Sequence, residues 1–265
     1  MQSQADSTAV LLFTTGEDTN PVPPPSKSLT VIVPALNEES NLPLALDGLI
    51  GVLGRDGVDW EIIVVNDGST DKTGAIANTF AKSEPRIHVL EHSKPAGIGT
   101  CFLDGIRASS KAAITWFPGD AENEPEELLR YLPLLDQVDI IVPYVTNREV
   151  RSRQRRFVSK LYLHVVNLLF GTTFSYTTGN VIYRRQVLDA VRPVATGFTY
   201  QTECLVRGAR AGFTFAEVPV RLGKRMHGRS KILTLGSVLS AAYDLGRLFV
   251  RVRVLRADKI VAMSA

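Results

Sequence analysis

The chain has 265 residues, of which 45% are hydrophobic, so it can bury one sizeable core. Its net charge of +3 conceals two opposite halves, because residues 1–146 carry −12 and residues 147–265 carry +15. Such a division suggests that one half handles cations while the other meets anions, either phosphates or an acidic membrane surface. Nucleic acid is a poor fit, because the basic half has no zinc-finger spacing, aromatic RNA-binding signature or helix-turn-helix.

The chain has only two cysteines, which offers no disulfide framework and fits a reducing cytoplasm. The N-terminus has no basic segment and only a five-residue apolar stretch, 9–13, so we expect no signal peptide. The most apolar candidate for a transmembrane helix, 232–250, contains Asp244 and Arg247 and does not qualify. We therefore expect a cytoplasmic protein whose contact with the inner face of the membrane is at most peripheral.

Residues 1–28 are polar and proline-rich, and we expect them to form a flexible tail before a single folded domain at 29–232. In that domain, short β-branched runs alternate with longer amphipathic stretches, a pattern typical of a parallel sheet covered on both faces. The expected strands are 29–34, 60–66, 87–91, 112–117 and 139–142, and the expected helices are 42–52, 73–82, 99–109 and 125–135. The predicted fold class is a doubly wound, mostly parallel α/β domain.

Polar clusters follow three of the expected strands. They are residues 35–38 (Ala-Leu-Asn-Glu), 67–69 (Asp-Gly-Ser) and 120–124 (Asp-Ala-Glu-Asn-Glu). In doubly wound sheets the ligand binds beyond the carboxyl ends of the strands, so the three clusters are expected to form one site.

The acidic cluster at 120–124 is the best pointer to chemistry. Carboxylates at the exit of a buried strand suit Mg²⁺ or Mn²⁺, and such an ion neutralises charge that builds up on a phosphate leaving group. The alternative is that these glutamates form only the negatively charged first turn of a helix, where the helix dipole favours them: Glu122, Glu124, Glu126 and Glu127.

Residues 31–39 (Val-Ile-Val-Pro-Ala-Leu-Asn-Glu-Glu), followed by 61–71 (Glu-Ile-Ile-Val-Val-Asn-Asp-Gly-Ser-Thr-Asp), resemble the opening of inverting family 2 glycosyltransferases of the GT-A fold, which use nucleotide-sugars. A carboxylate at Asp67 can accept an N–H of uracil or guanine. The alternative is a turn in which Ser69 or Asp71 caps the next helix. The resemblance implies these donor-binding residues: Pro34, Ala35, Asn37, Glu38, Asp67, Gly68 and Asp120.

Within this family, residues 29–232 are most similar to the dolichyl-phosphate mannose synthase group and its bacterial relatives, which transfer a sugar to a polyprenyl phosphate. The group's Asp-Ala-Asp metal motif corresponds to Asp120-Ala121-Glu122, with Glu in place of the second Asp. The resemblance implies a catalytic role for Asp120 and Glu122, with Mg²⁺ or Mn²⁺ as cofactor. It also makes Glu124 a third ligand or a residue that holds a water.

Two basic segments match the same group. Residues 155–159 (Arg-Arg-Phe-Val-Ser) resemble its Arg-Arg-x-x-Ser stretch, and 225–231 (Arg-Met-His-Gly-Arg-Ser-Lys) match its Arg-x-x-Gly-x-Ser-Lys signature. The alternative is a basic surface loop near anionic lipid. The residues that the resemblance assigns to the donor and acceptor phosphates are Arg155, Ser159, Arg225, Ser230 and Lys231.

The chain departs from the group at two places. An arginine expected after the fifth strand is missing at residues 144–146, unless Arg148 or Arg151 replaces it, and an expected Asp is absent from residues 175–180. The sugar or the acceptor can therefore differ from mannose and dolichol.

Glu203 stands where many family 2 enzymes keep a catalytic base for a hydroxyl acceptor. A phosphate acceptor is already anionic and barely needs deprotonation. Glu203 is therefore either a base or an orienting group that pairs with Arg207 at i+4 on a helix.

The C-terminal segment 233–265 is expected to hold a basic amphipathic helix and a tail. Four arginines among Leu, Val and Phe suit a helix on an anionic membrane face, and the alternative is a helix that packs on the domain.

The sequence predicts an inverting, metal-dependent glycosyltransferase that moves a sugar from a nucleoside-diphosphate sugar to a polyprenyl phosphate. One alternative is a transferase acting on a hydroxyl of a polysaccharide or small molecule. The other is a catalytically silent protein that binds a sugar nucleotide or a lipid phosphate.

Overall fold

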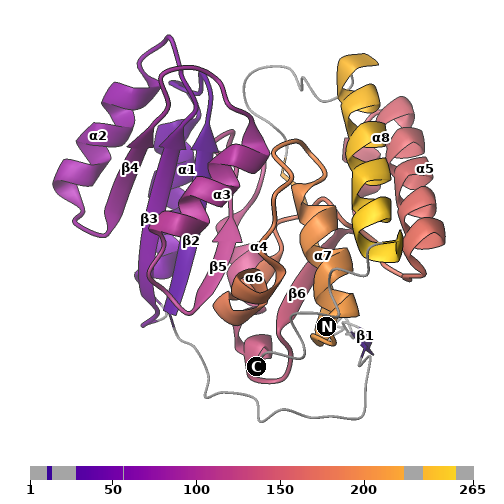
Figure 1. Cartoon of the computed structure of the whole chain (residues 1–265). Coiled ribbons are helices and arrows are strands. Elements are labelled where there is room, and N and C mark those ends of the chain that lie inside the picture. The colour runs from indigo at the N-terminus through magenta and orange to yellow at the C-terminus, as the bar shows by residue number, and fades with distance from the viewer. Residues whose placement is uncertain (1–10, 14–27, 56, 224–234, 255–265) are drawn as a thin grey trace, which may run out of the picture.

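The computed structural model describes residues 11–13, 28–55, 57–223 and 235–254 (Figure 1). Its strands form a single sheet in the order β1-β8-β6-β7-β5-β2-β3-β4, and helices cover both faces. β7 and β1 run antiparallel to their neighbours, and the other strand pairs are parallel. The expected doubly wound, mostly parallel fold is confirmed.

The strands are β1 (Leu11–Phe13), β2 (Ser28–Ala35), β3 (Asp59–Asn66), β4 (Ile87–Glu91), β5 (Ala113–Trp116), β6 (Ile140–Val145), β7 (Ile182–Arg184) and β8 (Phe215–Val220). The α-helices are α1 (Leu42–Leu53), α2 (Thr73–Ser83), α3 (Ile98–Ala108), α4 (Pro125–Leu129), α5 (Arg153–Phe170), α6 (Arg185–Val191), α7 (Tyr200–Arg210) and α8 (Leu235–Phe249). The remaining helical turns are η1 (Leu132–Asp136), η2 (Arg148–Val150) and η3 (Val250–Val254).

The register of the parallel strands sets the position of the site. Ala35 at the end of β2 lies opposite Asn66 at the end of β3, and Asn66 lies opposite Glu91 at the end of β4. β5 joins β2 on its other side, with Trp116 opposite Ile32. The loops that leave these strands therefore start from one edge of the sheet.

Alternating residues of the central strands feed two hydrophobic clusters, one on each face. Val31 and Val33 of β2 pack in the cluster that includes α1, whereas Ile32 packs in the cluster that includes α3 and α7. Because both faces are buried, the strands read as nearly continuous apolar runs. The parallel strands β2 to β6 were predictable from the sequence for this reason, whereas β8, which pairs in parallel with β6, was not predicted.

Two expectations about local structure are wrong. β1 lies within the expected tail at 1–28 and pairs with β8, with Leu12 opposite Ala216. The helix expected at 125–135 is interrupted, because α4 ends at Leu129 and η1 begins a separate turn that contains Pro133. Proline lacks the N–H that an α-helix interior requires, which explains the interruption.

The C-terminal helix α8 packs beside α5 (Figure 1). Leu245, Leu248 and Val252 are buried in the same cluster as the core of α7. This contact fits the alternative of a helix that packs on the domain, although Tyr243 and Arg247 remain exposed. Among the described helices, none is both long and apolar enough to cross a membrane.

The close crossing of α3 over β2 gives a test of the packing. A Cβ at Gly105 would lie 2.6 Å from a side-chain carbon of Ile32, which is fully buried. We expect Gly105→Ala to lower the free energy of unfolding by about 1–3 kcal/mol in a denaturant titration, because overpacking strains a core. Gly246→Ala on α8 is the matched control, since its Cβ meets no described atom within 4 Å. The control should be neutral or stabilising by up to about 1 kcal/mol, and equal losses in both variants would contradict this packing.

Candidate active site

The loop after β2 and the turn after β3 are joined by hydrogen bonds. The Asn37 N–H donates to Ser69 Oγ at 3.0 Å, and the Asn37 side chain accepts from the Thr70 N–H at 2.9 Å. Glu38 N–H donates to Thr73 Oγ1 at 2.8 Å. Asn37 has a positive φ of 56°, which asparagine tolerates better than most residues. The two predicted nucleotide-binding segments therefore form one surface at the edge of the sheet.

Pro34 and Ala35 contribute to this surface through their carbonyls. Pro34 O accepts from Gly119 N–H at 3.2 Å, and Ala35 O accepts from Asp67 N–H at 2.9 Å. These two bonds fix the start of the acidic segment and the start of the Asp-Gly-Ser turn against β2. The structure thus brings the three predicted polar clusters together.

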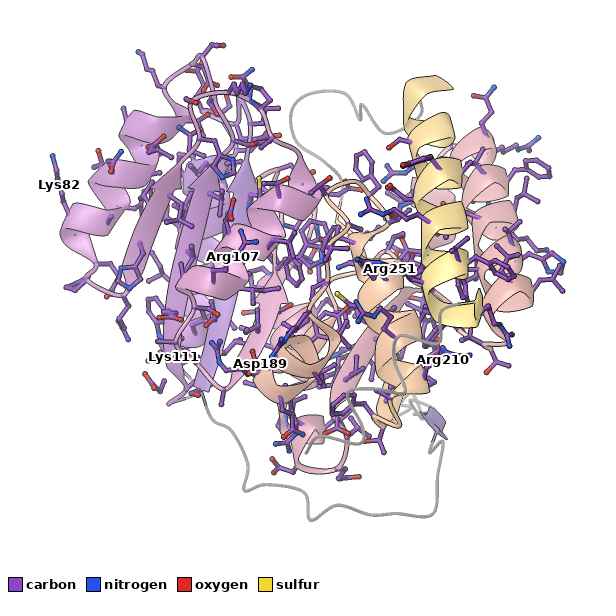
Figure 2. All side chains as sticks on the ribbon, viewed as in Figure 1. Lys82, Arg107, Lys111, Asp189, Arg210 and Arg251 are labelled. Atoms are coloured by element: carbon purple, nitrogen blue, oxygen red, sulfur yellow. The ribbon has the colours of Figure 1, made fainter. Side chains whose placement is uncertain are left out.

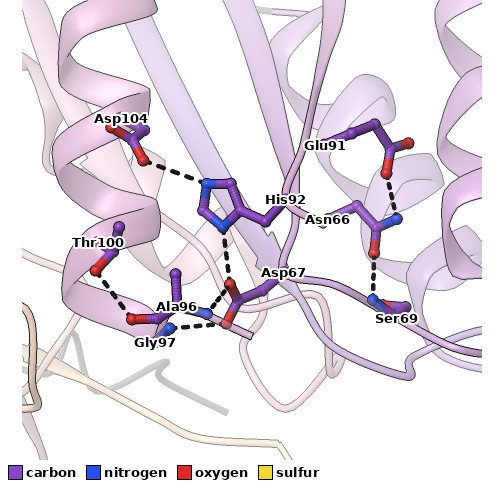
Figure 3. A network of polar contacts seen from close by, with 9 residues as sticks. All are labelled: Asn66, Asp67, Ser69, Glu91, His92, Ala96, Gly97, Thr100 and Asp104. Carbon is purple, nitrogen blue, oxygen red and sulfur yellow. Dashed lines mark hydrogen bonds and ion pairs between the residues drawn. The ribbon is translucent and has the colours of Figure 1, made fainter. Parts of the chain in front are cut away.

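Asp67 is buried beneath the loop that follows β4. Its side chain accepts from the backbone N–H of Ala96 at 2.7 Å and of Gly97 at 3.0 Å, and from His92 Nδ1 at 2.8 Å (Figure 3). Burial alone would raise the pKa of Asp67, but these hydrogen bonds and the nearby His92 outweigh it and lower the pKa below its usual value. Asp67 is therefore a carboxylate, and it fastens residues 92–97 over the end of β3.

Gly68 has a structural reason to be glycine. Its φ is +69°, and a Cβ there would lie 2.5 Å from the carbonyl carbon of Lys94. The space beside Gly68 is filled by the backbone of Lys94 and Pro95. The loop 92–97 can lie on the turn because that side chain is missing.

Asp67, His92 and Cys101 each place one potential metal ligand atom within 4.8 Å of the other two. The contacts are those of a hydrogen-bonded network, because the second ring nitrogen of His92 lies 3.2 Å from Asp104, which Arg107 also contacts. Burial and the adjacent Asp67 raise the pKa of the Cys101 thiol, which disfavours the thiolate that binds metals. The sequence analysis missed His92 and Asp104, although His92 directly follows a predicted strand.

The acidic segment lies beside the end of β2 and makes a tight turn. Ala121 has a positive φ of 53°, and the Glu122 N–H donates to Asp120 Oδ1 at 3.1 Å. Asp120 and Glu122 are half-buried, whereas Glu124 is exposed. These oxygen donors fit the expected Mg²⁺ or Mn²⁺ in chemical type. The alternative of a helical first turn holds for Glu126 and Glu127, which lie in the first turn of α4, whereas Glu122 and Glu124 precede that helix.

The end of β8 reaches the same segment. Gly223 N–H donates to Glu122 O at 3.1 Å, and Leu222 forms a bridge with Asn123. The predicted phosphate-binding residues Arg225, Ser230 and Lys231 follow directly in the chain but lie outside the described residues.

Arg155 lies on the first turn of α5, whose N-cap is Ser152. Burial and the like charge of Arg151 lower the pKa of Arg155, while attraction to Glu122 and Asp120 opposes this effect. The predicted phosphate-binding arginine is therefore close to the predicted metal-binding acids. Ser159 lies one turn further along the same helix and is half-buried.

Two residues were candidates to replace the arginine missing at 144–146, and the structure describes the side chain of one of them, Arg151. It donates to the Tyr176 hydroxyl, and its Nε is buried without a hydrogen-bond partner among the described residues. The side chain of Arg148, the other candidate, lies outside the described part of the structure. In the segment 175–180, where the expected Asp is absent, the buried Glu217 accepts from Ser175 N–H at 2.6 Å and from Ser175 Oγ at 2.7 Å.

Glu203 on α7 is only 3% exposed and is fully engaged by protein groups. One oxygen accepts from the backbone N–H groups of Val194 at 2.9 Å and Ala195 at 2.7 Å. The other pairs with Arg207 at 3.2 Å and with Arg251 at 3.5 Å, and Arg251 lies between α7 and α8 (Figure 2). The i+4 pair with Arg207 is confirmed, and these contacts favour an orienting role over that of a base.

The chain is similar to known proteins along most of its length. It is 31% identical over 259 residues to a polyprenol monophosphomannose synthase of Mycolicibacterium smegmatis, covering 93% of this chain and 96% of the relative. It is 29% identical to an undecaprenyl-phosphate mannosyltransferase of Micrococcus luteus, covering 76% of this chain and 86% of that protein.

Solved structures share the fold. Glucosyl-3-phosphoglycerate synthase from Mycobacterium tuberculosis, in complex with Mn²⁺, UDP and glucosyl-3-phosphoglycerate, superposes with a TM-score of 0.62 at 19% identity. The match covers 84% of this chain and 79% of that one, and it supports the GT-A fold alone. Residues 30–192 match the model of glycosyl transferase family 2. With the family model and the relatives in agreement, this chain belongs to glycosyl transferase family 2.

Proposed function

We propose that this glycosyltransferase moves a sugar from a nucleoside-diphosphate sugar to a polyprenyl phosphate. The observation that carries the proposal is the meeting of opposite charges at the carboxyl edge of the sheet. There, the acidic segment 120–124 lies near Arg155 and is bonded to Gly223, which leads into the basic residues 224–231. The names of the mycobacterial and micrococcal relatives, which specify polyprenol and undecaprenyl-phosphate mannose transfer, support this acceptor class.

The nucleotide end of the donor binds on the surface formed by the loops after β2 and β3. Asp67 Oδ1 already accepts from Ala96 and His92, whereas Oδ2 accepts from the Gly97 N–H. A carboxylate oxygen accepts about two hydrogen bonds, so Oδ2 is the atom that receives an N–H of the base. Asn37 and Glu38 act indirectly. The Asn37 side chain accepts from the Thr70 N–H and the Glu38 N–H donates to Thr73, so both hold the segment that follows Asp67.

Asp120 and Glu122 hold the divalent cation, with Glu124 as a third ligand. The bound ion neutralises charge on the departing nucleoside diphosphate. Arg155 is attracted electrostatically by these acids, so its guanidinium would pair with the phosphates of a donor held at the same site.

The acceptor is an anion, so its attack on the sugar requires charge neutralisation more than proton removal. Arg155, Ser159, Arg225, Ser230 and Lys231 supply the cations and hydroxyls for that anion. Glu203 is left with its orienting role, since its oxygens hold the 194–195 backbone and two arginines. A hydroxyl acceptor would instead need a base with a free face.

The outer face of the α5–α8 pair contacts an anionic membrane, where a polyprenyl phosphate resides. Phe157 and Leu161 are 70% and 53% exposed one turn apart on α5, Leu168 is 74% exposed, and Tyr243 on α8 is 71% exposed. Exposed basic side chains flank them on the same helices: Arg153, Arg156, Lys160 and Arg247. Apolar side chains among cations match the chemistry of an interfacial helix, and the C-terminal half carries a net charge of +15.

The metal role is tested by Asp120→Asn. We expect nucleoside-diphosphate affinity, measured by calorimetry with and without Mn²⁺, to lose its metal dependence in this variant. Turnover should fall at least about 100-fold, because a Lewis-acid cation contributes several kcal/mol. Glu126→Gln is the control, since Glu126 is an exposed acid on α4 paired with Arg55. A wild-type affinity that is the same with and without Mn²⁺ would remove the metal from the proposal.

The acceptor class is tested by comparing Arg155→Ala with Glu203→Gln, using a short-chain polyprenyl phosphate. We expect Arg155→Ala to lower kcat/KM about 100-fold, as expected when a half-buried cation is removed from an anion. Arg210→Ala, which removes an exposed arginine at the end of α7, should change it little. Glu203→Gln should lower the free energy of unfolding by about 1–3 kcal/mol and leave turnover within about threefold. Severe loss of turnover at unchanged stability in Glu203→Gln would instead identify a base and a hydroxyl acceptor.

Membrane contact is tested by sedimentation with vesicles. We expect the protein to bind anionic vesicles more tightly than zwitterionic ones. The double variant Phe157→Ser and Leu161→Ser should lose at least about tenfold in affinity, because burial of each side chain in lipid contributes on the order of 1 kcal/mol or more. Leu44→Ser on α1 is the matched control, an exposed leucine outside the α5–α8 pair. Equal binding by the double variant and the control would exclude this face.

A further inference from the structure

His92 bridges two carboxylates that come from different elements. Its Nδ1 lies 2.8 Å from Asp67 Oδ1 at the end of β3, and its Nε2 lies 3.2 Å from Asp104 Oδ2 on α3 (Figure 3). The ring is mostly buried, with 17% of its side-chain surface exposed. None of the residues assigned above to the cation or to the acceptor phosphate belongs to this bridge.

Both contacts of His92 can be hydrogen bonds in only one protonation state of its ring. An ionised carboxylate accepts hydrogen bonds and donates none, whereas a neutral imidazole has a single N–H. Both contacts are therefore hydrogen bonds when the ring carries a proton on each nitrogen. In that state one positive charge lies between two negative ones, and Arg107 donates to the far side of Asp104 at 2.5 Å.

The bridge also holds the loop that covers Asp67. His92 begins the segment 92–97, and Ala96 and Gly97 at its other end donate to the same carboxylate. Between these points, the backbone of Lys94 and Pro95 lies on Gly68. A displacement of His92 would therefore move both the loop and the turn that carries Asp67.

We propose that His92 is a positioning residue for the donor nucleotide: it acts through Asp67 by fixing the carboxylate and the loop 92–97, with Asp104 as its second anchor. This inference rests on the proposed function, because it takes Asp67 as the group that meets the base. It assigns His92 no contact with the substrate.

The groups that face the ring are Asp67, which follows β3, and Cys101 and Asp104 from α3, with Arg107 behind Asp104. The neighbouring Glu91 faces Asn66 and Asn78 instead. The two carboxylates are therefore the anchors of the ring, and removal of the Asp104 anchor should loosen His92 while leaving Asp67 in place.

The first measurement is calorimetry of UDP and GDP, each with Mn²⁺, on the full chain. We expect His92→Ala to weaken binding about tenfold, in line with the loss of a hydrogen bond to a charged group. His92→Asn should recover part of the loss, because its amide can donate to Asp67. His88→Ala is the matched control, an exposed histidine on β4, the strand that His92 directly follows. Thermal unfolding of each variant shows whether it is folded.

The second measurement is the affinity of Asp104→Ala and of the double variant with His92→Ala. We expect Asp104→Ala to weaken nucleotide binding less than His92→Ala does, because the contact between the ring and Asp67 remains. The double variant should bind about as weakly as His92→Ala alone, because both substitutions act through one bridge.

Two results would overturn the inference: unchanged affinity in folded His92→Ala, or losses from Asp104→Ala and His92→Ala that simply add in the folded double variant. Failure of wild type to bind either nucleotide would instead refute the donor site of the proposed function. The failures of the two proposals are therefore distinguishable.

Discussion

The parallel register of β2, β3 and β4 is the constraint on which the rest of the structure depends. Because Ala35, Asn66 and Glu91 end their strands at one level, the loops that follow must share the same edge. The polar side chains of those loops then satisfy one another: Asn37 holds the turn at Ser69 and Thr70, and Asp67 holds the loop that follows β4. A shift of one residue in this register would separate these groups and turn core side chains to the opposite face.

The charge division of the sequence has a structural counterpart at this edge. The acidic segment 120–124 leaves β5 beside β2, while Arg155 enters from α5 in the basic half of the chain. A ligand that carries both a cation and phosphates suits this half-buried site, because its cation pairs with the carboxylates and its phosphates pair with the guanidinium. A metal–nucleotide complex has this composition, which is why the proposal centres on a nucleoside-diphosphate donor.

Much of the fold was predictable because the relevant signals are local. Buried parallel strands are marked by continuous apolar runs, and β4 was expected at its observed bounds, 87–91. β1 was missed because a strand of three residues owes its existence to pairing with β8, some 200 residues away in the chain. The helix at 125–135 was predicted too long because the prediction followed the helical spacing of its apolar residues and gave too little weight to Pro133. Proline interrupts the backbone hydrogen bonds of an α-helix.

The candidate site was predictable from the sequence only in part. The three polar clusters followed from strand ends, whereas the roles proposed for Arg155 and for the Asp-Ala-Glu motif come from the family resemblance. The bridge from Asp67 through His92 to Asp104 was not predictable, because it joins a strand end to a helix with no characteristic spacing. For Glu203 the sequence left two roles open, and only the contacts with residues 194–195 and Arg251 favour one of them.

The central claim is sugar transfer to a polyprenyl phosphate, and the direct measurement is a transfer assay with labelled UDP-, GDP- and dTDP-sugars in the presence of Mn²⁺. The account predicts that label from one of these donors enters an organic-extractable product when polyprenyl phosphate is supplied, and that a polyprenol without the phosphate does not replace it. Donor turnover with label released only as free sugar, or transferred equally well to the unphosphorylated alcohol, would contradict it.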